Sequence, residues 1–254
     1  VNCLLRLNPD GSLDTSFTCP ELVGEYIGRC ANPKVTAVLV QPDGKILVGG
    51  IFPPYNGAPS RNLIRLNSDG TIDNTFVTGT GTNAGINAIS LRANGNILIS
   101  ASNVSPPNSF QPLVYNTYNV NTFFELGSKG NLLHREKSSR VDGKKILRRP
   151  DGKFNIIGES RSPYHRGLKT INNNGTLSIN TNLFGGFDNK PIGWSGQIQP
   201  SSCQDGVIQS DGKIILVGDF DKYNDILADG LIRLNSDYSI DTSFNIGQSF
   251  AYKY

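Results

Sequence analysis

The sequence is poor in the residue types that most catalytic and metal-binding sites use. Its 254 residues include no methionine, one tryptophan, two histidines and four cysteines. His134 and His165 stand apart from any serine or cysteine nucleophile motif, and no cysteine pair has C-x-x-C spacing. The G-x-S-x-G, H-E-x-x-H and glycine-rich nucleotide motifs are missing too. We therefore expect neither an enzyme nor a bound cofactor.

Long apolar runs and an excess of one charge are also missing. No apolar stretch approaches the roughly 20 residues of a membrane-spanning helix, so we expect no membrane insertion. The formal net charge is +3, which is too balanced to attract nucleic acid as a whole, and we expect no nucleic-acid partner. The chain begins with Val1 and not with methionine, which indicates a processed product or an excerpt of a longer polypeptide.

The cysteines leave the redox compartment open. Cys19 and Cys30 bracket a loop that contains a proline and a glycine, where a local disulfide could form. Cys3 and Cys203 stand near the starts of expected strands and could be inert buried thiols.

Turn residues are abundant and punctuate a repeated hairpin pattern. Residues 41–50 read Q-P-D-G-K-I-L-V-G-G, which predicts a tight P-D-G turn followed by an apolar strand. Residues 63–76 read L-I-R-L-N-S-D-G-T-I-D-N-T-F and predict a second hairpin around S-D-G. The first kind is termed the inner hairpin and the second the outer hairpin.

Inner and outer hairpins alternate along the whole chain. Outer hairpins are expected at 4–17, 63–76, 123–133, 168–184 and 231–244, and inner hairpins at 35–50, 86–101, 145–158 and 203–218. No window shows helical periodicity. A period of about 60 residues with about four short strands is the size of one propeller blade. We predict an all-β chain that folds as a β-propeller of about four to five four-stranded blades.

Pairing each inner hairpin with the outer hairpin after it defines the blades. It places them at 35–76, 86–133, 144–184 and 203–244. The outer hairpin at 4–17, with the loop that runs to residue 34, has no inner partner. It completes a fifth blade with sequence beyond Tyr254, packs against another chain, or belongs to a ring that closes irregularly. Residues 1–254 are thus a single propeller domain or an excerpt of one.

The apolar pattern predicts a gradient of burial across each blade. Residues 35–40 and 46–50 are almost continuously apolar, as in strands covered on both faces. Small residues at 49–50 would let neighbouring backbones approach closely. Residues 63–67 alternate and include an arginine, which predicts a strand with one wetter face.

The two hairpin patterns, Q-P-D-G-K-I-L-V-G-G and L-x-R-L-N-x-D-G-x-x-D-x-x-F, together resemble the delta-60 repeat, a bacterial and phage β-propeller-type repeat. The resemblance covers nearly the whole chain. It is strongest at 35–76 and 207–244, moderate at 4–17 and degraded between 86 and 184. It implies the propeller fold and a setting in large secreted, surface or virion proteins. It implies no established activity.

Three aspartates, Asp14, Asp73 and Asp241, follow the outer turns at a fixed offset. They could be metal ligands or catalytic carboxylates, but catalytic residues do not usually recur once per blade. We interpret them as structural residues that hold the turns by hydrogen bonds. We expect the recurring arginines to pack their stems along the sheet. The other structural turn residues are Gly44, Gly70, Gly152 and Gly212.

One acidic segment is a weak metal candidate. Asp219, Asp221 and Asp225 place oxygen donors close together, as calcium loops do. The segment lacks the EF-hand glycine and distal glutamate, and Lys222 lies among the candidates. We expect no bound metal.

Two groups of residues are candidates for binding a partner. Aromatic side chains that could stack on sugars, or else fill the core, are Tyr115 and Tyr118 in the expected long loop 103–122, and Trp194. A basic stretch could meet an acidic glycan or an acidic subunit, or else be a solvated face that discourages edge pairing. Its residues are Arg135, Lys137, Arg140, Lys144, Lys145, Arg148 and Arg149.

These observations favour a non-catalytic propeller that serves as a structural or adhesion module of an exported or virion assembly. By the resemblance, that assembly would be a phage tail, fibre or capsid-associated structure, and its partners would be other subunits. The alternative is a glycan-binding bacterial surface propeller that recognises a cell-surface glycan. Either function places the chain in a virion or outside the cell.

Overall fold

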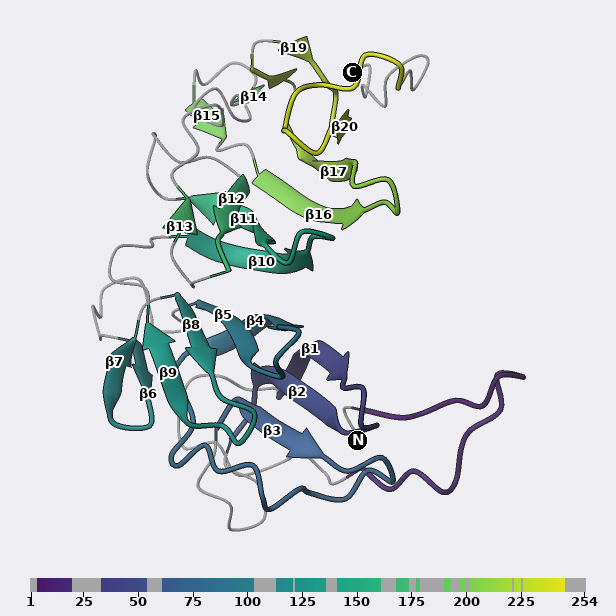
Figure 1. The fold of residues 1–254 in the computed structure, drawn as a ribbon, viewed down its shortest axis with the longest axis vertical. Coiled ribbons are helices and arrows are strands. Elements are labelled where there is room, and N and C mark those ends of the chain that lie inside the picture. Colours follow the sequence, from purple (N-terminus) through teal and green to yellow (C-terminus); the bar gives the residue numbers. More distant parts are fainter. Residues whose placement is uncertain are drawn as a thin grey trace. The chain divides into compact units, whose positions relative to one another are not determined.

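The computed structural model describes residues 4–19, 33–53, 61–102, 113–120, 122–135, 141–160, 168–173, 177–178, 190–192, 197–199, 202–220, 222–224 and 226–244. Every regular element among them is a β-strand (Figure 1), and none of them forms a helix that could cross a membrane. The all-β prediction is confirmed. The chain divides into two compact units, residues 1–138 and 139–254.

The strands are short and follow the predicted hairpins. The first unit contains β1 (Lys34–Val40), β2 (Ile46–Ile51), β3 (Leu63–Leu66), β4 (Gly85–Leu91), β5 (Ile97–Ser102), β6 (Leu113–Tyr115), β7 (Tyr118–Val120), β8 (Phe123–Leu126) and β9 (Leu132–Arg135). The second contains β10 (Val141–Arg148), β11 (Phe154–Ser160), β12 (Leu168–Ile171), β13 (Leu177–Ser178), β14 (Lys190–Ile192), β15 (Gln197–Gln199), β16 (Ser202–Ile208), β17 (Ile214–Asp219), β18 (Lys222–Tyr223), β19 (Ile226–Leu227) and β20 (Leu231–Leu234).

Four antiparallel sheets repeat one plan. Their strand orders are β1-β2-β3, β4-β5-β8-β9, β10-β11-β12-β13 and β16-β17-β20. In each sheet an inner hairpin supplies the first two strands, and the outer hairpin that follows continues the sheet. In the two three-stranded sheets a single bridge, Leu66 to Ile72 or Leu234 to Ile240, takes the place of the fourth strand. No closed sheet forms among the described strands, and the number of blades stays a prediction.

Local chemistry explains the hairpin turns. The predicted turn glycines have left-handed backbones, with φ of 82° at Gly44, 91° at Gly70, 82° at Gly152 and 83° at Gly212. Glycine adopts this conformation without the strain that a Cβ would add. The first strand of every inner hairpin also carries a register shift that the turn motifs do not predict. It lies between Val35 and Ala37 in β1, Ile86 and Ala88 in β4, Gly143 and Lys145 in β10, and Cys203 and Asp205 in β16.

The predicted burial gradient is wrong in two places. β2 is buried from Ile46 to Gly50, but β1 alternates exposed and half-buried residues, and Val38 and Val40 are 48% and 64% exposed. β3 is buried throughout, including Arg65, which is 6% exposed. A charged side chain can be buried here because its guanidinium pairs with Asp73.

Successive sheets within each unit pack through unequal side chains. β4 packs against β1 and β2 in the first unit, and β16 packs against β10 and β11 in the second. A Cβ added to Gly49 would lie 2.5 Å from Ile86 Cγ2 and 3.0 Å from Ile89 Cδ1. In the second unit the glycine is on the later sheet, where a Cβ on Gly206 would lie 2.7 Å from Ile157 Cδ1.

Candidate functional site

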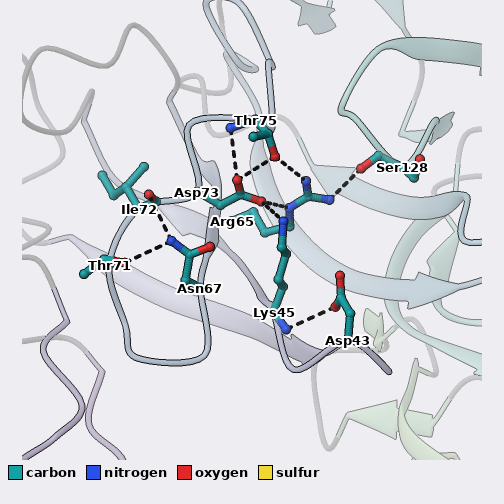
Figure 2. Close-up of polar contacts among 9 residues, drawn as sticks. All are labelled: Asp43, Lys45, Arg65, Asn67, Thr71, Ile72, Asp73, Thr75 and Ser128. Atoms are coloured by element: carbon teal, nitrogen blue, oxygen red, sulfur yellow. Dashed lines mark hydrogen bonds and ion pairs between the residues drawn. The ribbon is translucent and has the colours of Figure 1, made fainter.

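The recurring aspartates are engaged by cationic and hydroxyl side chains. Arg65 Nε donates to Asp73 Oδ2 at 2.7 Å, and Lys45 Nζ donates to the same oxygen at 2.9 Å. The backbone N and Oγ1 of Thr75 donate to Oδ1 at 3.0 and 2.6 Å. Figure 2 shows these groups converging on the carboxylate. Four donors therefore occupy the acceptor sites of this one carboxylate.

The other two aspartates repeat the arrangement with one difference. Asp241 binds Arg233 Nε at 2.7 Å and Lys213 Nζ at 2.9 Å. Asp14 binds Arg6 Nε at 2.7 Å, but within the part of the chain that the structure describes no lysine reaches it. The lysine of each complete cluster comes from the inner hairpin of the same sheet.

These contacts set the protonation of the carboxyl groups. Burial alone would raise the pKa of Asp73, but the hydrogen bonds from Lys45, Thr75 and Arg65 outweigh it and hold the pKa far below its ordinary value. Hydrogen bonds from Ser243 and Lys213 lower the pKa of Asp241 in the same way. All three carboxylates are therefore ionised at neutral pH and unsuited to donate a proton.

The two recurring arginines of the first unit, Arg6 and Arg65, also reach the next outer turn. Arg65 lies over the Phe76 ring, 4.6 Å from its centroid, and Arg6 lies 4.8 Å from the Phe17 centroid. Arg6 then donates to the carbonyl of Ser68, and Arg65 to that of Ser128. The predicted role of the arginines, packing of their stems along the sheet, therefore omits their main contacts.

A groove of about 800 Å³ gathers some of the predicted binding residues in the first unit. It lies beside the β6–β7 hairpin and β9, and Tyr118, Lys129, Leu133 and Arg135 line it with Val77. Tyr118 is 54% exposed, and Arg135 Nη1 donates to the carbonyl of Asn119 at 2.9 Å. Among the described residues, the groove lining holds two cationic side chains and no acidic one.

Tyr115 corrects part of the sequence prediction. It is 1% exposed, its hydroxyl donates to the carbonyl of Gly130, and its ring packs 5.3 Å from that of Phe124. Burial raises the pKa of its hydroxyl. Tyr115 therefore fills the core and is no platform for a sugar. The expected loop 103–122 also contains the β6–β7 hairpin.

The described residues of the basic stretch belong to both units and have different partners. Arg135 lines the groove of the first unit, whereas Lys145 of the second unit pairs with Asp205. Arg149 Nη1 donates to the Tyr238 hydroxyl at 2.7 Å. Lys144 has Gln204 as its partner, and Arg148 is exposed. Lys137, Arg140 and Trp194 lie outside the described residues.

The acidic segment is only partly described. Asp219 is exposed, and Asp221 and Asp225 lie outside the described residues. Among the residues that are described, no group of three or more histidine, cysteine or acidic side chains could hold a metal ion. Cys19 and Cys203 are buried, while Cys3 and Cys30 lie outside the described part, so the disulfide prediction stays a prediction.

One important residue escapes the repeat pattern. Tyr238 occupies the position of the turn glycine in the last outer hairpin, with φ of 71°. Its hydroxyl lies 2.6 Å from Thr170 Oγ1 and 3.3 Å from Asn155 Nδ2, in addition to Arg149. The signal is visible in the sequence, where D-Y replaces the D-G of the outer turns at 10–11 and 69–70.

Comparisons with known proteins support the propeller-type fold. A family model described as a β-propeller domain of unknown function, DUF5122, matches residues 1–17, 41–76 and 209–244. Each matched segment ends at the phenylalanine that closes an outer hairpin. The expectation of a propeller-type repeat agrees with this match, while the delta-60 name stays a resemblance. A search of curated proteins finds no significant match.

Solved structures with similar folds come from varied proteins. A protein of unknown function from Bacteroides caccae is 11% identical with a TM-score of 0.38, covering 83% of this chain and 81% of that one. PorZ, a surface component of the type-IX secretion system of Porphyromonas gingivalis, is 10% identical with a TM-score of 0.45, covering 93% of this chain and 30% of that one. A luciferin-regenerating enzyme is 11% identical with a TM-score of 0.41, covering 81% of this chain and 60% of that one.

The expectation that the chain is not an enzyme, which rests on the missing catalytic motifs, is wrong. The similar structures include the luciferin-regenerating enzyme, a glucose dehydrogenase and a virginiamycin B lyase, so enzymes share this kind of fold. At such low identity the likeness concerns the fold alone. No reaction or substrate passes from those proteins to this chain.

Proposed function

We propose that the chain is a structural or adhesion module of an exported or virion assembly, and that it contacts another subunit through the groove of the first unit. The observation that carries the proposal is the surface of that groove. Val77 and Leu133 are 67% and 51% exposed, and Lys129 and Arg135 flank them. Exposed apolar side chains rimmed by cations suit a partner segment that is apolar and acidic. The resemblance to a repeat of secreted, surface and virion proteins supports the setting.

Photo-crosslinking within the native assembly tests this function. A benzoyl-phenylalanine replaces Leu133 in the groove or, as a matched control, Val207, which is 52% exposed outside it. We expect position 133 to crosslink to one defined subunit of the purified assembly and position 207 to give no such product. Equal crosslinking from both positions, or a chain that never enters an assembly, would reject the proposal.

A glycan-binding function is the second candidate, because Tyr118 exposes its ring beside Arg135. A tyrosine face with an adjacent guanidinium suits an acidic sugar. An array of acidic glycans should then show binding that Tyr118→Ala removes and Arg135→Ala weakens. Arg148→Ala, which removes an exposed cation outside the groove, should leave it unchanged. An array with no binding excludes this candidate.

A further inference from the structure

The first outer hairpin, residues 4–17, exposes side chains that its counterparts bury. Leu5 and Leu7 are 61% and 55% exposed. The equivalent residues of the second outer hairpin, Ile64 and Leu66, are 4% and 0% exposed. The difference has a visible cause: Ile64 and Leu66 belong to β3, which pairs with β2 of an inner hairpin. No strand of the described chain pairs with residues 4–7 in this way, and Figure 1 shows the purple hairpin extending from the β1–β3 sheet.

The hairpin is nevertheless held where the outer hairpin of a preceding sheet would lie. Arg6 donates to the carbonyl of Ser68, and the Thr18 amide donates to the carbonyl of Asp69 at 2.9 Å. The second outer hairpin holds the next sheet by the same pair of bonds, from Arg65 to Ser128 and from Val77 to Lys129. Residues 4–17 are therefore the outer half of a sheet whose inner half is missing from the described residues.

Strand β1 is uncovered on the side where that inner half would lie. Val38 is 48% exposed. Its counterparts, Ile89 in β4 and Gly206 in β16, instead face the second strand of the preceding inner hairpin. Ile89 lies against Gly49, and Gly206 lies against Ile157. One inner hairpin inserted beside residues 4–7 would pair with them and also cover Val38.

The ion pairs of the recurring aspartates also indicate that an inner hairpin is missing beside residues 4–17. Asp73 and Asp241 each bind a lysine from the inner hairpin of their own sheet, Lys45 and Lys213, at 2.9 Å. Asp14 binds Arg6 but no lysine of the described chain. The missing hairpin would bring this lysine, since it follows the D-G turn in both complete clusters.

We propose that the surface formed by Leu5, Leu7, Asp14 and Val38 binds a β-hairpin of the inner type that is supplied by another polypeptide. The four inner hairpins described within residues 1–254 are already paired within their own sheets, so none of them is the occupant. It adds a strand to residues 4–7 through backbone hydrogen bonds, as in β-strand addition. Its lysine binds Asp14, and a small residue of its second strand faces Val38. This surface is separate from the groove and does not depend on the function proposed above.

A peptide with the sequence of residues 35–50 serves as the probe. Titrated into the full chain and followed by fluorescence anisotropy, it should bind one to one with micromolar affinity. Hydrogen exchange should show new protection at the amides of residues 4–7. Leu7→Asp should abolish binding, whereas Leu227→Asp, at a residue 68% exposed in the second unit, should not change it.

The lysine contact is tested by a double-mutant cycle. Replacing the peptide lysine by alanine, or Asp14→Asn in the chain, should weaken binding about fivefold to tenfold, and the two changes together no more than either alone. Asp10→Asn in the same hairpin is the control and should have no effect. The proposal is overturned if the peptide does not bind, if binding ignores Leu7→Asp, or if the amides of residues 4–7 are already protected in the free chain. A concentration-dependent dimer that Leu7→Asp abolishes would make a second copy the occupant and overturn it as well.

Discussion

Arg65 Nη1 donates a hydrogen bond to the carbonyl oxygen of Ser128 at 2.5 Å, although 63 residues separate them in the chain. The same guanidinium binds Asp73 through Nε and lies over the Phe76 ring. The Arg65 side chain thus contacts both its own outer hairpin and the next outer turn. The stability of the first unit should depend strongly on this cluster, and its equivalents differ enough in burial to act as controls.

Removal of the Asp73 carboxylate should destabilise the first unit. The side chains of Arg65 and Asp73 are 6% and 4% exposed. Asp73→Asn therefore leaves the buried Arg65 guanidinium without the negative charge of its carboxylate partner. We expect a loss of about 2 to 3 kcal/mol in the free energy of unfolding, measured by urea denaturation followed by circular dichroism. Asp14→Asn is the control, since Arg6 and Asp14 are 38% and 17% exposed, and its loss should be clearly smaller. Equal losses would contradict the role of burial.

The same cluster should make stability depend on pH. The pKa of Asp73 is lower in the folded than in the unfolded chain, so its stabilisation is complete above the ordinary carboxyl pKa of about 4. It is lost as the pH falls from there through the folded value. The difference in unfolding free energy between the wild-type chain and Asp73→Asn should therefore be constant near pH 7 and shrink below about pH 4. A difference that grows on acidification would show the opposite linkage.

The open side of the first outer hairpin should appear in a pair of glycine substitutions. Gly11 and Gly70 have similar φ values, 85° and 91°. A Cβ on Gly70 would lie 2.8 Å from the carbonyl of Thr18, whereas one on Gly11 meets nothing within 4 Å. Gly11→Ala should cost about 1 kcal/mol from backbone strain alone, and Gly70→Ala more. Urea denaturation of both variants measures the difference, and a larger effect at Gly11 would be inconsistent with an open surface there.

Cys203 should resist chemical modification in the folded chain. Burial raises the pKa of its thiol to about 12, so almost no thiolate forms at pH 8. Iodoacetamide should leave Cys203 unlabelled in native buffer and label it in urea, as read by peptide mass spectrometry. Labelling at equal rates in the two conditions would show that the thiol is accessible.

The Tyr238 hydroxyl should stabilise the second unit. It contacts Arg149, Thr170 and Asn155 in a buried position. Tyr238→Phe keeps the ring but leaves these polar groups without their shared partner, and we expect a loss of about 1 to 2 kcal/mol. Urea denaturation followed by circular dichroism measures this loss. Tyr118→Phe, at an exposed hydroxyl, is the control and should be neutral.

The hairpins could be predicted from the sequence because their signals are local. Aliphatic runs on either side of an N-G turn predicted a hairpin at 86–101, and the structure has β4 and β5 at Gly85–Leu91 and Ile97–Ser102. Turn chemistry and β-branched residues act over a few positions, so no knowledge of neighbouring sheets is needed.

Burial and site geometry could not be predicted in the same way, since they depend on contacts between repeats. Residues 35–40 look like a strand covered on both faces, yet Val38 is exposed because the described chain supplies no sheet to cover it. Tyr115 looked like an exposed loop aromatic, but it packs on Phe124. The groove beside Tyr118 forms from three separate segments, within 75–79, 115–118 and 129–135, which no local motif predicts.

The glycine–isoleucine contacts between sheets have a consequence for the order of the repeats. In the first unit the earlier sheet carries the hollow, Gly49, and the later one the knob, Ile89, while in the second unit Ile157 is the knob and Gly206 the hollow. Shuffled modules would set two hollows or two knobs against each other, leaving a void or a clash. Sheets that share one strand plan are therefore not interchangeable, because the side chains at each contact are complementary only to those of the natural neighbouring sheet.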